Sequence, residues 1–585
     1  MINLNRLRMQ FILRRLGLLP FAWRLRHYAK MRMDASFRRR EGELRREYGE
    51  FRRRYGASLG IRLNQGLPTK RKALVVSVGF PSGAQAELGL IKGLEMAGFS
   101  PVVLCKRDPW LRNYYRLAGV EKIHYWDEFT RPVSGGLLRD FAVRLRSFEK
   151  LLSLEYKGAR VGRIAASTLF RNLRIGSLDL SSFDVRRVVL EYLTAGMAHA
   201  AAAQELLDQV QPQIVMFVDR GYTPQGELFD ICVARGVDTI TWNAAHKGNA
   251  LILKRYRMEN RDEHPASLSE DSWDQALRMP WTEEHQKQLQ QELSGTYASG
   301  DWYSEVGTQF RTRIADPMEI RKRLGLDPAK KTAVIFPHIL WDGTFFWGKD
   351  LFRSYEEWFI QTVRAACANP AANWVIKIHP ANLVKNSRDG IIGEPSEVLA
   401  IRKHIGALPA HIFLIPADSD INTFSLFGVM DYCLTVRGTI GIEAASFGIP
   451  VLTAGTGRFD HQGFTIDSKT LEEYLEKVSR IQEIPRLTSE QWERAQRFAY
   501  FIFLRRPLLT RVFTLEYRKD AKASIQTKVN AQSREDWLRA EDLRSFSEWL
   551  LRADRIDYLA PPPGGQSEDL LGREASEHEF LRLAP

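Results

Sequence analysis

Short apolar runs alternate with stretches of helical spacing along most of the chain, and this alternation predicts an α/β fold. Residues 73–79 are predicted to form a buried strand, residues 85–96 a helix that ends at Gly98, and residues 101–105 the next strand. A strand, a helix and a strand at this spacing indicate a βαβ unit. The first half of the chain is therefore expected to contain a parallel sheet.

The same alternation of strands and helices recurs twice further along the chain. A second strand–helix–strand group lies at residues 213–242, after a long helical and irregular stretch at 131–205. From residue 332 to residue 453, five apolar runs alternate with helices, which predicts a second parallel sheet. The whole chain is therefore predicted to contain six segments. They are a basic amphipathic arm (1–68), a Rossmann-like lobe with a helical insertion (69–255), a helical connector (256–330), a second Rossmann-like lobe (331–485), C-terminal helices (486–555) and a disordered tail (556–585).

Composition narrows the class of protein. The 585 residues are 44% apolar and 26% charged, which is ordinary for a globular enzyme of several domains. The four cysteines are far apart and show no CxxC spacing, so we expect neither disulfides nor a zinc site, and a reducing cytosol fits best. The sequence has no apolar run of the length that a membrane-spanning helix requires.

The net charge of +14 is concentrated at the N-terminus. Residues 1–56 hold sixteen Lys and Arg against five Asp and Glu, whereas the remaining chain is close to neutral. Apolar residues recur at helical spacing between the arginines, as in a helix that lies on an anionic membrane surface. A basic helix packed on the body is the alternative. Arg14 and Arg15 interrupt the apolar stretch, so a signal peptide is not expected, and nucleic-acid binding is not expected because no recognition module follows.

Polar residues follow the strands of the second lobe, where parallel sheets bind their ligands. His338 and Asp342 follow the first strand, and both are candidates for the general base. Lys377, His379 and Pro380 end the second strand, and a histidine there can donate a hydrogen bond to a phosphate.

The remaining candidates lie after the next two strands. Pro416 precedes Asp418-Ser-Asp420, where we expect Asp420 to cap a helix and no metal to bind. The turn from Arg437 to Glu443 runs from a strand into a helix, so its amides, Thr439 and the Arg437 cation favour an anion. Gly438 and Gly441 allow close approach of a ligand, and Glu443 is placed to accept a ribose hydroxyl. A plain helix cap is the alternative.

These motifs together resemble a known family. The segments Lys377-Ile-His-Pro380, Asp431–Thr435, Gly438–Ala445 and Gly448–Val451 are similar to those of bacterial capsule polysaccharide synthesis proteins, which include Kdo transferases. The resemblance covers mainly residues 331–470. It implies a GT-B-like fold, with two Rossmann-like lobes facing a cleft, and a metal-independent, inverting glycosyltransferase in which His379 and Thr439 contact the donor phosphate and Glu443 the ribose.

The predicted function is transfer of a sugar from a CMP-, UDP- or GDP-linked donor to a lipid-linked or growing surface polysaccharide. No other cofactor is expected, and the arm is expected to hold the protein peripherally on the cytoplasmic face of the membrane. Asp342, or an unassigned acid of the first lobe, would deprotonate the acceptor. Three alternatives stay open: a polyol-phosphate transferase, a nucleotide-sugar 2-epimerase, and a non-catalytic polysaccharide-assembly protein. Gly79–Gly83, Arg220–Gly226 and His246 are candidate cleft residues of the first lobe by position.

Overall fold

Alternate residues of one strand face two different cores in the first lobe. In the computed structural model, Ala73 and Val75 of β1 (Lys72–Val76) face one core, and Leu74 and Val76 face the other. Such alternation is the geometry of a strand that is buried on both faces. The structure describes residues 18–65, 71–303, 313–517 and 525–561, together with Met9, Ile12, Leu13 and Leu16.

The first lobe is built on a seven-stranded mixed sheet. Its strands lie in the order β12 (Pro507–Leu509), β6 (Ala250–Tyr256), β5 (Asp238–Ala244), β4 (Ile214–Phe217), β1, β2 (Ser100–Cys105) and β3 (Lys122–Tyr125). The strands from β5 to β3 are parallel, whereas β6 is antiparallel to both of its neighbours. The predicted Rossmann-like lobe is therefore confirmed, with two further strands at one edge.

Two groups of helices cover this sheet. One face is covered by α3 (Ala35–Leu59), α4 (Pro81–Met96), α5 (Pro109–Leu117), α21 (Arg534–Arg539) and α22 (Glu541–Leu551). The other face is covered by α6 (Trp126–Phe129), α7 (Gly135–Arg144), α8 (Phe148–Leu152), α9 (Val161–Leu173), α10 (Phe183–Val210) and α11 (Gln225–Ala234). Residues 131–205, predicted to be helical and irregular, thus form most of one layer of the first lobe.

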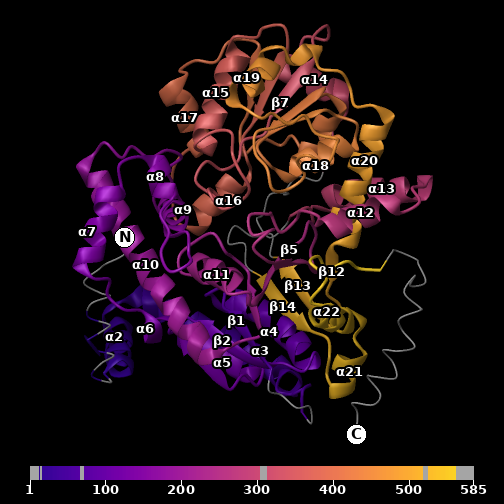
Figure 1. The fold of residues 1–585 in the computed structure, drawn as a ribbon. Helices are drawn as coiled ribbons and strands as arrows, with labels where there is room; N and C mark the ends of the chain where they lie inside the picture. The colour runs from indigo at the N-terminus through magenta and orange to yellow at the C-terminus, as the bar shows by residue number, and fades with distance from the viewer. Residues whose placement is uncertain are drawn as a thin grey trace.

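The second lobe contains a wholly parallel sheet of five strands. The order is β11 (Val451–Thr453), β10 (Tyr432–Thr435), β7 (Thr332–Ile335), β8 (Asn373–Lys377) and β9 (Ile412–Ile415). Its faces carry α15 (Tyr355–Cys367), α16 (Ala381–Arg388), α17 (Ser396–His404), α18 (Thr439–Ser446) and α19 (Leu471–Ser479). Figure 1 shows the two lobes one above the other, with α9, α11 and α16 between the sheets. The GT-B-like arrangement of two Rossmann-like lobes is confirmed.

The connector and the C-terminal segment both join the lobes. The connector contributes α12 (Glu270–Arg278), α13 (Glu283–Ser299) and α14 (Pro317–Leu324), while residues 304–312 lie outside the described residues. From the second lobe, α20 (Ser489–Tyr500) and a π-helical turn at Phe501–Arg505 lead back to β12.

The prediction for residues 486–555 was incomplete, because the stretch contains strands as well as helices. Besides β12, the hairpin of β13 (Phe513–Tyr517) and β14 (Ile525–Val529) packs on the first lobe, where the yellow elements of Figure 1 lie beside the indigo ones. The predicted disordered tail was wrong for residues 556–561, since Asp557 is buried there. Residues 562–585 lie outside the described residues.

The arm divides into two different helices. In α3, Phe51 and Leu59 are buried against the first lobe, and the indole of Trp110 donates to Glu41 at 2.9 Å. In α2 (Leu19–Met33), Phe21 is 64% exposed and Leu25 is 58% exposed. The expectation of one interfacial helix over residues 1–56 therefore does not hold for α3, which is part of the body. Most of residues 1–17, and residues 66–70, lie outside the described residues.

No helix in the described parts of the chain combines the length and the apolar character needed to cross a bilayer.

Candidate functional site

The ends of three neighbouring strands of the second lobe open into one cavity of about 320 Å³. The strands are β7, β8 and β10, which lie side by side at the centre of the sheet. Parallel strands place the loops at their carboxyl ends on the same edge of a sheet, and this is why residues far apart in sequence meet here. Eight predicted site residues line the cavity: His338, Asp342, Lys377, His379, Pro380, Gly438, Thr439 and Glu443.

His379 is held as a neutral hydrogen-bond donor. Its Nδ1 accepts a hydrogen bond from the Ala381 amide at 3.2 Å, so the hydrogen of the neutral ring lies on Nε2. Burial, together with Lys385 and Lys377, lowers the pKa of His379 to about 4. Pro380 starts α16 and turns the chain away from the strand, so His379 stays at the cavity wall. The site thus offers a donor at the position that the sequence predicted.

The start of α18 forms another part of the cavity wall. Gly438 precedes the first helical residue, and its amide donates to the Thr435 hydroxyl at 3.2 Å. The Gly438 amide is therefore already engaged. The next two amides, those of Thr439 and Ile440, have no intrahelical partner because they lie in the first turn of the helix. An anion site at this helix start stays a prediction, and its amide donors would be Thr439 and Ile440 rather than Gly438.

Glu443 lies one turn into α18 and accepts a hydrogen bond from the hydroxyl of Tyr297, a connector residue. Burial raises the pKa of Glu443 to about 8, so the carboxyl is largely protonated at neutral pH. A protonated carboxyl can donate to a hydroxyl as well as accept from one. Since Tyr297 also lines the cavity, the connector closes this end of the site.

The two candidates for the general base are poorly suited to that role. Asp342 accepts hydrogen bonds from Lys385 and, at 3.0 Å and 2.9 Å, from Arg171 and the Tyr222 hydroxyl. Burial alone would raise the pKa of Asp342, but the Lys385 and Arg171 cations outweigh it and hold that pKa well below its ordinary value. Asp342 therefore binds protons weakly and ties the second lobe to the first.

His338 uses its Nε2 to accept a hydrogen bond from the Arg437 amide at 3.3 Å. Its ring stacks on Tyr355 with 4.5 Å between the centroids. Burial and the neighbouring Arg437 lower the pKa of His338 well below its ordinary value. The Nε2 lone pair is thus occupied, and His338 is not placed to take a proton through that nitrogen.

Three predicted site residues lie outside the cavity lining: Pro416, Gly441 and Arg437. Pro416 follows β9, and this strand is at the edge of the sheet, away from the three central strand ends. Gly441 packs against Phe459, whose ring would be 2.5 Å from a Cβ at this position, so packing rather than ligand approach requires the glycine. Asp420 does not cap a helix; it pairs with Arg323, and Asn422 caps the 3₁₀ turn at Thr423–Gly428 instead.

Arg437 was expected to offer a cation to the phosphate, and the structure corrects this. Its guanidinium is buried, pairs with Asp350 and donates to the carbonyl of Thr456 at 3.0 Å. The side chain therefore joins the loops after β7 and β11 behind the cavity. Asp350 lies 87 residues away in sequence, so no local pattern revealed this pair.

Other residues at the site were not predicted. Lys385, one turn into α16, lines the cavity, and a cation so soon after the His-Pro pair was a usable signal. Trp302 and Tyr303 of the connector also line it, and Arg458 donates to the Thr439 hydroxyl at 2.7 Å. Arg458 comes from the loop after β11, where the sequence shows only a glycine-rich stretch.

Residues 346–489 match the family model described as capsule polysaccharide biosynthesis protein. The resemblance of the second lobe to that family is confirmed. The matched capsule biosynthesis segment includes His379, Thr439 and Glu443, whereas His338 and Asp342 precede it. It covers about a quarter of the chain and none of the first lobe.

Several solved structures are similar to this chain. The beta Kdo 2,4 transferase of Thermosulfurimonas dismutans KpsC is 14% identical, with 54% of this chain and 84% of that chain covered and a TM-score of 0.33. The beta Kdo 2,7 transferase of the same KpsC is 13% identical, with 60% and 89% covered and a TM-score of 0.31. The UDP-GlcNAc 2-epimerase of Neisseria meningitidis is 12% identical, with 74% and 98% covered and a TM-score of 0.25. No curated protein sequence matches the chain.

Proposed function

We propose that this protein is a glycosyltransferase that moves a sugar from a nucleotide-activated donor to a lipid-linked or growing surface polysaccharide. The observation that carries the proposal is the shared cavity, which is lined by His379, by the start of α18 and by Glu443 one helical turn further on. A phosphate donor at one wall and a helix start at another suit a nucleotide phosphate. The match of residues 346–489 to capsule biosynthesis proteins supports the same substrate class.

In the proposed reaction the protein stabilises the departing nucleotide. The bond between the anomeric carbon and the phosphate oxygen breaks, and the charge that develops on that oxygen is met by the Nε2 hydrogen of His379 and the amides of Thr439 and Ile440. Lys377 and Lys385 line the same cavity and add positive charge. These groups suit a metal-independent reaction, because they supply the charge stabilisation that a metal ion would otherwise give.

The acceptor hydroxyl loses its proton as its oxygen bonds to the anomeric carbon, and a single displacement of this kind inverts the anomeric configuration. We assign the proton acceptor to Asp219, which follows β4 of the first lobe. Its Oδ1 accepts from the Gly221 amide at 3.2 Å, and burial raises its pKa. The turn that carries Asp219 is fixed against the second lobe, because the Tyr222 hydroxyl bonds to both Asp342 and Gly343.

We further propose that α2 binds the anionic inner face of the cell membrane, which places the protein peripherally on the cytoplasmic side. Its exposed apolar residues recur at spacings of three and four: Leu18, Phe21, Leu25 and Tyr28. Arg24 and Arg26 lie beside them in the sequence and are exposed. An apolar stripe with flanking arginines is the pattern of an interfacial helix.

The experiment that tests the function is a thermal-shift panel of CMP, UDP and GDP on the full chain. A nucleotide at 100 times its dissociation constant should stabilise the fold by about 2.7 kcal/mol. At least one nucleotide should shift the melting temperature, and the His379→Ala variant should lose most of the shift. A polyol-phosphate transferase or an epimerase would also bind nucleotide, so product analysis with the bound sugar donor separates these. No shift with any nucleotide would favour a non-catalytic assembly protein.

A further inference from the structure

Two buried arginines near the cavity have no carboxylate partner. Arg458 is 9% exposed and Arg220 is 5% exposed, and neither forms an ion pair within the described residues. The Nε of each lacks a hydrogen-bond partner there as well. Arg220 lies over the rings of Phe229, Tyr256 and Trp347, which offset part of its charge. Burial lowers the pKa of both groups, which reflects the cost of a cation in the interior. Such a cost is expected where a bound anion completes the charge balance.

Arg458 lies directly behind the start of α18. Its guanidinium donates to the Thr439 hydroxyl at 2.7 Å and to the Arg437 carbonyl at 3.2 Å, and it also hydrogen-bonds with Tyr303. Thr439 and Tyr303 both line the cavity. The Arg458 guanidinium is therefore separated from the predicted phosphate position only by the Thr439 side chain. It adds its charge to the hydrogen bonds that the amides of the helix start can donate.

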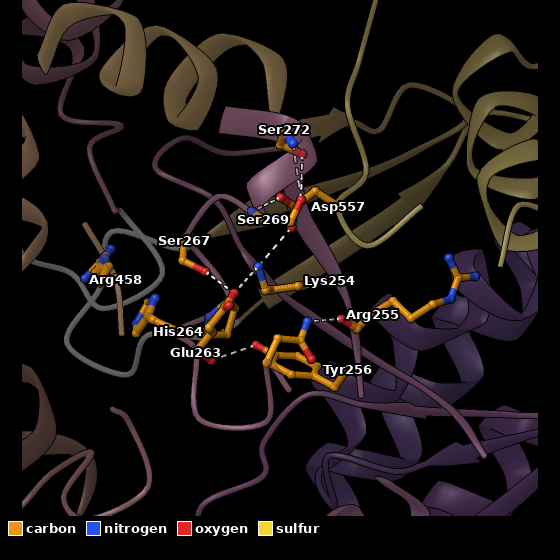
Figure 2. Close-up of polar contacts among 12 residues, drawn as sticks. Lys254, Arg255, Tyr256, Glu263, His264, Ser267, Ser269, Ser272, Arg458 and Asp557 are labelled. Carbon is orange, nitrogen blue, oxygen red and sulfur yellow. Dashed lines mark hydrogen bonds and ion pairs between the residues drawn. The ribbon is translucent and has the colours of Figure 1, made fainter. Parts of the chain in front are cut away.

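His264 adds a donor beside Arg458. Its Nδ1 accepts from the Ala266 amide at 3.0 Å, so the neutral ring carries its hydrogen on Nε2. Burial, followed by Arg458 and Arg220, lowers the pKa of His264 well below its ordinary value. Figure 2 shows His264 and Arg458 as neighbours that come from the connector and from the second lobe.

The loop that presents His264 is fixed from both lobes. Arg220 donates to the carbonyls of Arg261 and Glu263, on either side of the turn. The His264 amide donates to the Gly457 carbonyl at 2.7 Å, which is the residue before Arg458. The His264 ring lies 4.7 Å from that of Trp347. His264 and Arg458 are therefore held in place before any ligand binds, which is the preorganisation that an anion site requires.

We propose that Arg458, His264 and the Thr439 hydroxyl form a second anion subsite beside the start of α18, which binds an oxyanion of the donor other than the phosphate held by His379. This rests on the proposed function, since the donor must first occupy the cavity. The chemistry that fits an arginine, an imidazole N–H and a hydroxyl is a phosphate or a carboxylate. The oxyanion is then either the second phosphate of a nucleoside diphosphate or the carboxylate of an acidic sugar on a nucleoside monophosphate.

Binding of matched ligands to the full chain tests the subsite. Titrations compare UMP with UDP, CMP with CDP and GMP with GDP, and compare CMP with a CMP-linked sugar acid. The ligand with the extra oxyanion should bind roughly tenfold or more tightly, which corresponds to about 1.4 kcal/mol. Arg458→Gln should abolish this gain and change the affinity for the monophosphate less. Arg458→Lys, which keeps the charge, should retain part of the gain, and so should show that the effect does not come from misfolding.

The control is Arg278→Gln, at a guanidinium that is 82% exposed and pairs with Asp274. This variant should keep the full gain. A gain confined to the diphosphates identifies a phosphate, and a gain confined to the sugar acid identifies a carboxylate. If nucleotides bind but no ligand gains from its extra oxyanion, or if Arg458→Gln leaves the gain intact, the subsite is refuted while the proposed function stands. If no nucleotide binds at all, both proposals fail.

Discussion

Lys254 and Asp557 form a fully buried ion pair, with 3.1 Å between Nζ and Oδ1, although 303 residues separate them in the sequence. Figure 2 shows Asp557 reaching from the C-terminal segment to Lys254 on β6, and Lys254 continuing to Glu263. Arg506 also lies 3.1 Å from the Asp557 carboxylate. The C-terminal segment thus neutralises two buried cations beneath the loop that presents His264, and so it belongs to the structure of the lobe junction.

Asp557→Asn should destabilise the protein by about 3–5 kcal/mol, because it leaves Arg506 buried without its counter-charge and leaves Lys254 with Glu263 alone among the carboxylates described around it. Urea unfolding followed by tryptophan fluorescence measures this change. Asp554→Asn is the matched control, since Asp554 is exposed and its loss should cost less than about 1 kcal/mol. Equal effects of the two substitutions would contradict the account of the buried pair.

The stability that the Lys254–Asp557 ion pair contributes should depend on pH. Burial opposes ionisation of Asp557, but Arg506 and Lys254 outweigh it and lower the pKa to about 2, from an ordinary value of 3.8. The stabilisation is therefore present above pH 3.8 and is lost as the pH falls towards 2. The stability difference between wild type and Asp557→Asn should be constant near neutral pH and shrink in this acid range.

His379→Ala should lower turnover by about 100-fold or more, as expected when a donor to the departing oxygen is removed. The fold should be kept, since the ring lies at a cavity wall and its Nδ1 makes a hydrogen bond with only the Ala381 amide in the described structure. Turnover and melting temperature are measured together, with His461→Ala as the control at a side chain that is 66% exposed. A large fall in melting temperature would instead indicate a structural histidine.

Glu443→Gln should become more stable than wild type as the pH rises from about 4.5 to about 8. In the folded protein the Glu443 carboxyl keeps its proton up to a pKa of about 8, whereas in the unfolded chain it ionises near its ordinary value of 4.5. The free energy of unfolding of the wild type therefore falls by up to about 1.4 kcal/mol for each pH unit across this range. The glutamine does not titrate and can still accept from Tyr297. A stability difference that is flat with pH would show that Glu443 is ionised in the folded state.

The positions of the main site residues could be predicted because they follow from local pattern and one topological rule. Lys377 and His379 lie at the end of β8, and Thr439 begins the helix that follows β10; a parallel sheet brings such strand ends together. Glu443 follows by helical periodicity. These inferences need no knowledge of contacts between distant side chains.

The sequence could not show which way the buried arginine side chains point. Arg437 turns away from the cavity because Asp350 is available behind it, and Arg458 takes the place at the helix start. Both outcomes depend on loops that meet only after folding. Likewise β12 has three residues, too few to show a period, and it is a strand because the edge of β6 is there to pair with it.

Removal of residues 1–33 should release the protein from vesicles of anionic lipid and leave the body folded. The cut preserves Asp34, which caps α3 by accepting from the Phe37 amide at 3.0 Å, so the packing of α3 on the first lobe is unaffected. Co-sedimentation with phosphatidylglycerol vesicles measures binding, which should weaken at high salt. A Phe21→Ser, Leu25→Ser double variant separates the apolar stripe from the arginines. Persistent binding of the truncated protein would place the membrane contact elsewhere on the body.

Asp219→Asn and Asp342→Asn should have different kinetic effects, because one carboxylate is proposed to accept a proton and the other holds the lobes together. Asp219→Asn should lower kcat by about 10²–10⁴-fold with little change in the donor KM, and should abolish the rise in rate with pH that deprotonation of the base produces. Asp342→Asn should keep that pH dependence, since its pKa is already held far below the working range, but should raise KM and lower the melting temperature by loosening Lys385, Arg171 and Tyr222. If the pH dependence disappears in Asp342→Asn and survives in Asp219→Asn, the two roles are exchanged.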